Sequence, residues 1–249
     1  MFSHADAYDQ FMGRYSSLLA AQMVDLAGVR AGQRVLDVGC GPGALTAELA
    51  ARVGAGAVAA VDPSEPYVAA ARTRVPGADV RVASAESLPF ADRSFDAALA
   101  QLVVHFMRDP VDGIREMARV TKGGGVIAAC VWDTAGASPI TPFWNAAREI
   151  DPSVDDESRR PGVREGHLVE LFAAAGLREI TASSVVADLA HPTFESWWHP
   201  FELGVGPAGQ FLARLDAGAR GQLRERARSL LPAPPFTHHV RAWAARGLV

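Results

Sequence analysis

The glycine-rich stretch VLDVGCGPGALTAEL, residues 35–49, has the residue types of a ligand-binding turn. Gly39, Gly41 and Gly43 let the backbone turn tightly and approach a ligand, because side chains there would fill the space that the ligand needs. Asp37 precedes this turn, where its carboxylate would repel a pyrophosphate but suit an amino group or another cation. The turn therefore favours a nucleotide-type ligand that carries a positive charge.

Two further polar positions follow the turn along the chain. Asp62 ends the next apolar segment, about 20 residues beyond the turn, where a carboxylate can accept hydrogen bonds from the hydroxyls of a ribose. Ala85 and Glu86 come just after a third apolar segment, at the edge of the same cleft, where an adenine could lie. Together the three positions predict a site for a cation that contains adenosine.

Other cofactor classes share part of this pattern. Gly39, Gly41 and Ala44 satisfy the G-x-G-x-x-G/A fingerprint, so a nicotinamide-dependent oxidoreductase remains an alternative, although Asp37 and the adenine loop disfavour it. A P-loop is excluded because no lysine followed by serine or threonine closes the turn. A protein that binds the cofactor without catalysis is the alternative from outside the enzymes.

Short apolar strands and amphipathic helices alternate along the chain, and these elements must position the polar residues. Strands are expected at residues 34–38, 57–61, 80–83, 95–100, 123–132 and 177–187, and a final one in THHVRAWAARG. One or two helices are expected at residues 3–27, and single helices at 45–53, 66–74, 110–120 and 165–175. This alternation predicts an α/β fold of the Rossmann-like, doubly wound kind, with a mostly parallel seven-stranded sheet and helices on both faces.

Residues 189–236 interrupt the alternation with FESWWHPF, several prolines and an arginine-rich helical stretch. We expect this region to form an inserted helical cap above the carboxyl edge of the sheet. The predicted organisation is an N-terminal helical lid at 1–32, a Rossmann-like cofactor-binding core at 33–188, the cap at 189–236 and the final strand of the core sheet at 237–249.

Composition narrows the classes of partner. With 49% apolar and 21% charged residues, the chain is typical of a globular protein. The net charge of -4 and the lack of a dense basic run make nucleic acid an unexpected partner. No apolar run approaches the roughly 20 residues that span a bilayer, and no leader is visible, so a cytoplasmic protein without a membrane partner is expected.

Cys40 and Cys130 have no metal-binding spacing, so no metal is expected. The oligomeric state stays open.

The motifs VLDVGCGPG, VDPS and AESLPFADRSFD occur in this order at residues 35–43, 61–64 and 85–96, within a matching stretch of roughly residues 8–129. In this respect the chain resembles the class I S-adenosylmethionine-dependent methyltransferases, in particular the small-molecule group with a type 11 domain. The resemblance implies S-adenosylmethionine as the cofactor and a small-molecule acceptor for its methyl group.

The resemblance also implies roles for residues of the first two motifs. The turn from Gly39 to Gly43, which includes Cys40, would wrap the methionine and the ribose. Asp62 would bind the ribose hydroxyls, and Pro63 would pack on the adenine.

Two more segments gain a role from the same resemblance. Ala85 and Glu86 would border the adenine, and Ser84 stands where the family often has an acid, which shifts the expected polar contact toward Glu86. In YDQFMGRYS, Arg14 and Tyr15 would lie near the methionine carboxylate, which an arginine can bind with two hydrogen bonds.

Methyl transfer needs a general base only when the acceptor must lose a proton. His105, after the fourth strand in AQLVVHFM, is the best candidate for that base, and Gln101 would lie beside it at the cofactor edge. The alternative is that His105 packs between Phe106 and the next helix.

Tryptophans gather in the two segments expected to roof the cleft. We expect an acceptor that is at least partly apolar, held between Trp132 and Trp144 on one side and Trp197 on the other. Phe143 would stand with the first two, and Trp198 with Trp197. The alternative is that these aromatic residues form the core of the cap itself.

Overall fold

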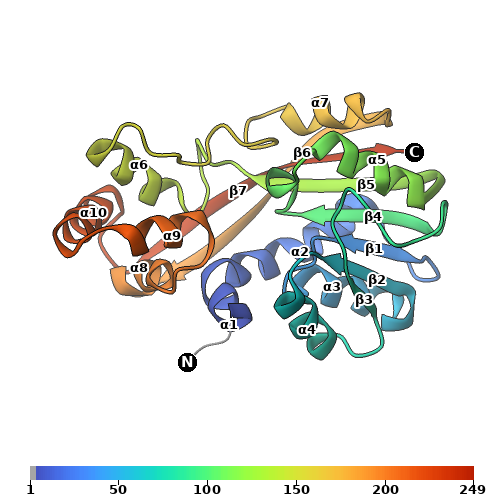
Figure 1. Cartoon of the computed structure of the whole chain (residues 1–249), viewed down its shortest axis with the longest axis horizontal. Helices are drawn as coiled ribbons and strands as arrows, with labels where there is room; N and C mark the ends of the chain where they lie inside the picture. The colour runs from blue at the N-terminus through green and yellow to red at the C-terminus, as the bar shows by residue number, and fades with distance from the viewer. Residues whose placement is uncertain (1–3) are drawn as a thin grey trace.

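The computed structural model describes residues 4–249, which are built around one seven-stranded sheet (Figure 1). The strands lie in the order β3-β2-β1-β4-β5-β7-β6. Their bounds are β1 Val35–Val38, β2 Val58–Asp62, β3 Asp79–Val82, β4 Phe95–Gln101, β5 Thr121–Trp132, β6 Arg178–His191 and β7 Phe236–Leu248. The first five strands pair in parallel, and β7 runs antiparallel to both of its neighbours. The predicted fold class is confirmed.

Helices cover both faces of this sheet. Successive side chains of a strand point to opposite faces, so an apolar strand needs packing partners on both. The helices of the core are α2 Arg14–Ala27, α3 Ala44–Val53, α4 Glu65–Arg74, α5 Pro110–Val120 and α7 His167–Ala174. Val35 packs with residues of α2 and α3, whereas its neighbour Leu36 packs with residues of α5 and α7. All residues of β1 and β2 are buried, as apolar strands between two helical layers must be.

The N-terminal segment reaches toward the carboxyl edge of the sheet. It consists of α1 His4–Tyr8, a π-helix at Asp9–Gly13 and then α2. The predicted helix at 3–27 is therefore present but contains one turn of wider winding. Residues 1–3 of the predicted lid lie outside the described residues.

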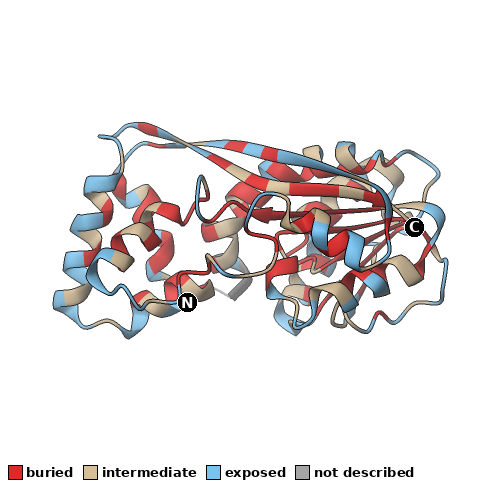
Figure 2. Cartoon of the chain, turned by 90° about the horizontal axis from the view of Figure 1, so that it is seen from above, coloured by how far each residue is buried: buried red, intermediate tan, exposed pale blue. Residues whose placement is uncertain are grey.

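The strands β6 and β7 have 14 and 13 residues, against 12 in β5 and four to seven in β1 to β4. In Figure 2 they run as a continuous ribbon from the core to a separate group of helices. This group is the cap, which contains α6 Thr141–Ile150, α8 Phe194–Glu202, α9 Gly206–Arg214 and α10 Ala217–Leu230. Three of these helices come from the segment predicted as a cap, whereas α6 comes from the connection between β5 and α7.

The cap has a core of its own, separate from the two sides of the sheet. Phe143 of α6 stacks on Phe201 of α8 with ring centroids 4.7 Å apart, and residues of α9 and α10 complete the same cluster. Large aromatic side chains make up a substantial part of this cluster, and each of them buries a large apolar area. The cap is therefore held together by its own packing as well as by β6 and β7.

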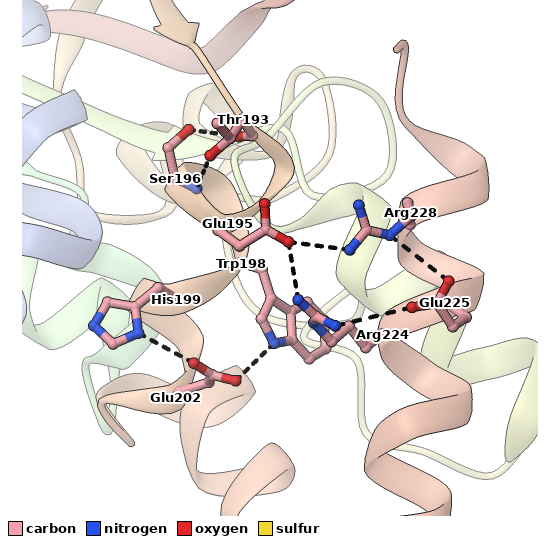
Figure 3. Close-up of polar contacts among 9 residues, drawn as sticks. All are labelled: Thr193, Glu195, Ser196, Trp198, His199, Glu202, Arg224, Glu225 and Arg228. Atoms are coloured by element: carbon pink, nitrogen blue, oxygen red, sulfur yellow. Dashed lines mark hydrogen bonds and ion pairs between the residues drawn. The ribbon is translucent and has the colours of Figure 1, made fainter. Parts of the chain in front are cut away.

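Polar contacts between α8 and α10 explain the arginine-rich stretch (Figure 3). The guanidinium groups of Arg224 and Arg228 donate to the same carboxylate oxygen of Glu195, at 2.9 and 3.1 Å. Arg228 also lies 4.0 Å from the ring centroid of Phe194. At the start of α8, the hydroxyl of Thr193 accepts a hydrogen bond from the backbone N–H of Ser196 and so caps the helix.

Among residues 4–249 no helix is both long enough and apolar enough to cross a membrane.

Candidate active site

A cavity of about 460 Å³ lies between the carboxyl edge of the sheet and the cap. Its walls come from the ends of β1, β2, β4 and β5, from the N-terminal segment, from the connection after α6 and from α9. Six of the residues singled out in the sequence line it: Gly39, Gly41, Asp62, Gln101, His105 and Trp132. The fold therefore brings the predicted cofactor turn and the predicted base to one space.

The glycine turn has the backbone conformation that its sequence requires. Gly39 and Gly41 have φ angles of 74° and 52°, a region that residues other than glycine rarely adopt. A Cβ on Gly39 would lie 2.3 Å from Cγ2 of Val103, whereas a Cβ on Gly41 would meet nothing within 4 Å. Gly41 thus faces open space, and a side chain there would occupy part of the cavity.

Asp62 fixes the turn while keeping room for a ligand. Its Oδ2 accepts a hydrogen bond from the backbone N–H of Gly41 and its Oδ1 from that of Ser64, both at 2.9 Å. Burial raises the pKa of this carboxyl group, and the two backbone hydrogen bonds oppose the rise. Each carboxylate oxygen has a second lone pair, so the hydrogen-bonding capacity for two ribose hydroxyls is present.

Asp37 lies deeper than the predicted role requires. It is buried, its Oδ2 accepts a hydrogen bond from the hydroxyl of Thr46 at 2.6 Å, and burial raises its pKa to about 7. It does not line the main cavity but a narrow side pocket of about 20 Å³, together with Tyr8 and Gln101. This pocket continues from the glycine turn, so Asp37 borders the cofactor region from behind.

Gln101 presents an unsatisfied acceptor to the same region. Its Nε2 donates to the backbone oxygen of Ser16 at 3.0 Å, but its buried Oε1 has no partner among the described residues. A buried polar atom without a partner costs free energy unless a ligand supplies the hydrogen bond. With the open face of Gly41 and the free lone pairs of Asp62, this acceptor fits a cofactor that carries hydroxyl and amino groups.

A second cavity of about 320 Å³ holds the predicted adenine residues Pro63, Ala85 and Glu86. Gly39, Val103 and Phe106 line both cavities, so the two are adjacent. One carboxylate oxygen of Glu86 accepts a hydrogen bond from the backbone N–H of Arg108 at 2.8 Å. Part of its hydrogen-bonding capacity is thus used to hold the loop that borders this cavity.

Arg14 and Tyr15 do not reach either cavity. Arg14 donates to the backbone oxygen of Ser196 in the cap at 2.8 Å, and the hydroxyl of Tyr15 lies 3.1 Å from Nε2 of His191. Neither position supports the predicted contact with the methionine carboxylate. Both connect the N-terminal segment to the cap and to β6.

Tyr8 takes the position beside the cofactor turn, one turn of π-helix before Arg14. It lines the main cavity and the side pocket, and its ring centroid is 5.4 Å from that of Tyr67. Burial raises the pKa of its hydroxyl to about 12. The π-helical turn changes which residues of the segment face inward, and no local sequence pattern predicts such a turn.

His105 lies in the wall of the main cavity, after β4. It is buried, its ring centroid is 3.9 Å from that of Phe106, and its Nδ1 has no partner among the described residues. Burial and the nearby charge of Arg160 lower its pKa to about 3. The ring is therefore neutral at physiological pH and a weak base.

The predicted aromatic residues divide into two groups. Trp132 lines the main cavity and packs edge-on against Tyr15, with centroids 6.2 Å apart. Trp144 and Trp197 are buried in the core of the cap and are not part of the cavity wall. Their indole N–H groups donate within the protein, to Glu157 at 3.1 Å and to the backbone oxygen of Pro139 at 3.3 Å.

Two ionisable residues in the cavity wall, Glu157 and Arg160, were not predicted from the sequence. Both lie in the irregular connection between α6 and α7. Glu157 is buried although its side chain is ionisable, and it adopts a φ of 65°, which is strained for a residue other than glycine. Burial raises its pKa, and Arg160 opposes that rise.

Within the described part of the chain, no group of three or more histidine, cysteine or acidic residues is placed to hold a metal ion.

The sequence and the fold both match known proteins. Residues 36–129 match the family model described as "Methyltransferase domain". An uncharacterized methyltransferase of Mycobacterium sp. (strain KMS) is 32% identical over 202 residues, which are 76% of this chain and 79% of that protein. A demethylmenaquinone methyltransferase of Paenarthrobacter aurescens (strain TC1) is 30% identical over 177 residues, 64% of this chain and 68% of that protein.

Among solved structures, a SAM-dependent methyltransferase from Thermotoga maritima matches with a TM-score of 0.56. The match covers 97% of this chain and 98% of that one at 21% identity, so it shows a common fold. The chain spans less than half of the length of several other curated relatives that it matches.

Proposed function

Because the chain belongs to the class I S-adenosylmethionine-dependent methyltransferases, we propose that it transfers a methyl group from S-adenosylmethionine to a small, partly apolar acceptor. The observation that carries this proposal is the shared cavity. The glycine turn and Asp62 form one part of its wall, and Trp132, Ile140 and Val205 form another. A cofactor on the first part would leave an apolar space beside it.

When bound, S-adenosylmethionine supplies a methyl group that is already activated for transfer. The protein then has to align the acceptor and exclude water, and alignment alone can lower a barrier by roughly 7–11 kcal/mol. In this proposal Asp62 binds the ribose, Gln101 accepts a hydrogen bond from the cofactor, and Pro63, Ala85 and Glu86 border the adenine. His105 contacts the acceptor as a neutral ring in the cavity wall, since its low pKa makes it a poor general base.

The acceptor end of the cavity supports an apolar substrate. It lies under α9, where Val205 and Ala208 face the space, and Trp132 closes it from the sheet side. Demethylmenaquinone, the acceptor in the name of one relative, is itself largely apolar. A cavity of about 460 Å³ is in the range of small-molecule sites.

The test is a calorimetric titration of the full chain with S-adenosylmethionine and, separately, with NAD. We expect saturable binding of the first and none of the second. Binding of NAD alone would replace the proposal by a nicotinamide-dependent oxidoreductase. Labelled cofactor incubated with cell extract then separates an enzyme from an idle cofactor-binding module, since only an enzyme passes the label to a small molecule.

A further inference from the structure

The charges in the wall of the main cavity restrict what kind of acceptor it can take. Among its lining residues in the described chain, only Asp62, Glu157 and Arg160 have a carboxyl or guanidinium side chain. Asp62 belongs to the glycine turn at the cofactor end and already holds two backbone N–H groups. The groups of this kind left for an acceptor are therefore the carboxyl group of Glu157 and the guanidinium of Arg160.

These two groups are paired in charge but not joined by a hydrogen bond. Nε of Arg160 lies 3.8 Å from Oε1 of Glu157, beyond the 2.7–3.2 Å of an N–H···O hydrogen bond. Since the two groups do not bond each other, each keeps hydrogen-bonding capacity for a ligand. Glu157 can accept a hydrogen bond from the ligand, and Arg160 can donate one to it.

Neighbouring side chains hold the pair in place. The indole of Trp144 donates to Oε2 of Glu157 at 3.1 Å, and the guanidinium of Arg160 lies 5.0 Å from the ring centroid of Phe106. The strained backbone of Glu157 directs a buried acid to a position that regular structure would not provide. Strain of this kind persists where the surrounding structure enforces it, and it is common in ligand sites.

We infer that Glu157 and Arg160 recognise a hydroxyl group on an uncharged acceptor. A hydroxyl both donates and accepts, so one such group can donate to Glu157 and accept from Arg160. An anionic acceptor would meet the carboxylate and a cationic one the guanidinium, both at short range. This inference rests on the proposed function, because it names the substrate class of the same cavity.

The experiment compares four probes that share one apolar body and differ in the head group. They are para-ethylphenol, its methyl ether para-ethylanisole, the para-ethylbenzoate anion and para-ethylbenzylammonium. Each is titrated by ligand-observed NMR into the full chain saturated with S-adenosylhomocysteine, the demethylated form of the cofactor. We expect the phenol to bind at least about tenfold tighter than each of the other three, as a hydrogen bond to a charged group predicts.

Two variants make the test specific to the pair. Glu157→Gln leaves Arg160 unmatched, so the benzoate should gain about tenfold in affinity while the phenol loses affinity. Arg160→Gln leaves Glu157 unmatched, so the benzylammonium should gain instead. The matched controls are Glu165→Gln and Arg159→Gln, which remove the same charges from nearby exposed positions outside the cavity wall.

The outcomes separate the inference from the proposed function. No binding of S-adenosylhomocysteine or S-adenosylmethionine to the wild-type chain would overturn both. Normal cofactor binding with equal affinity for the phenol and its ether, with a preference for either ion, or with no probe bound would overturn the inference alone. Cofactor affinity also reports whether each variant is folded, and either variant suffices to show the exchange of preference.

Discussion

The hydroxyl of Thr46 donates a hydrogen bond to Oδ2 of Asp37 across 2.6 Å, behind the glycine turn. Thr46 lies in α3 and Asp37 in β1, so this contact ties the helix that follows the turn to the strand that precedes it. Burial still dominates at this carboxyl group and raises its pKa to about 7 from an ordinary value of 3.8. In the absence of a ligand cation, the strand therefore carries an acid that is costly to ionise.

We predict that Asp37→Asn stabilises the cofactor-free protein at about pH 8 and weakens cofactor binding. Because folding raises the pKa of Asp37, the folded chain binds more protons than the unfolded chain does. The stability that protonated Asp37 contributes is therefore full below its ordinary pKa and is lost as the pH rises through about 7. The gain should be on the order of a few kcal/mol at about pH 8 and should vanish at about pH 4.

Urea unfolding of the variant and the wild type at both pH values checks the first part, and calorimetry with S-adenosylmethionine checks the second. A variant that is less stable at the higher pH would contradict the buried-charge argument. Thr46→Val is the matched control, because it removes the hydrogen bond and leaves the acid, so it should lower stability at the higher pH.

Asp62→Ala should weaken binding of S-adenosylmethionine by at least about tenfold, because hydrogen bonds to a charged group contribute roughly 1.5–3 kcal/mol. The loss includes the backbone N–H of Gly41, which would no longer be held. Asp62→Asn should lie between, since it keeps one acceptor oxygen without the charge. The control is Glu65→Ala on the exposed side of α4, and unchanged affinity in Asp62→Ala would contradict the assigned role.

The sequence predicted the parts of the molecule that local patterns determine. The glycine turn, Asp62 and the alternating strands and helices follow from backbone conformation and apolar periodicity, and the predicted strand and helix bounds agree with the structure within a few residues. Tyr8 lines the cavity where Arg14 was predicted to lie, because the π-helical turn at Asp9–Gly13 changes which residues of the N-terminal segment face inward. Glu157 and Arg160 lie in an irregular connection whose path depends on the packing of the cap, so no periodicity or motif could have placed them.

His105 should make the folded protein sensitive to acid. Folding lowers its pKa to about 3 from 6.5, so the stability linked to the neutral ring is full above the ordinary pKa and is lost as the pH falls below it. In His105→Gln the loss of unfolding free energy between about pH 7 and pH 5 should be smaller by on the order of 2 kcal/mol. Chemical unfolding at the two pH values measures this, and an unchanged pH dependence would mean that the ring is not kept neutral by burial.

Tyr8→Ala should weaken cofactor binding by roughly two- to tenfold, because the variant loses the ring that packs on Tyr67 beside the turn. Tyr8→Phe keeps that ring and should bind the cofactor nearly as well as the wild type. Calorimetry of both variants with S-adenosylmethionine makes the comparison. If the two variants lose affinity equally, the hydroxyl and not the ring is the important group.

The tryptophans of the cap region should separate into one that contacts the acceptor and two that stabilise the fold. Trp132 lines the cavity, so Trp132→Phe should weaken binding of para-ethylphenol to the cofactor-loaded chain with little change in stability. Trp197 is fully buried in the cap, so Trp197→Phe should lower the free energy of unfolding by about 1–3 kcal/mol and leave probe affinity unchanged. Trp144→Phe should do both to a smaller degree, because it removes the hydrogen bond that holds Glu157. The measurements are urea unfolding and the same NMR titration. A loss of probe affinity in Trp197→Phe without a loss of stability would show that the acceptor reaches into the cap, beyond the cavity wall described above.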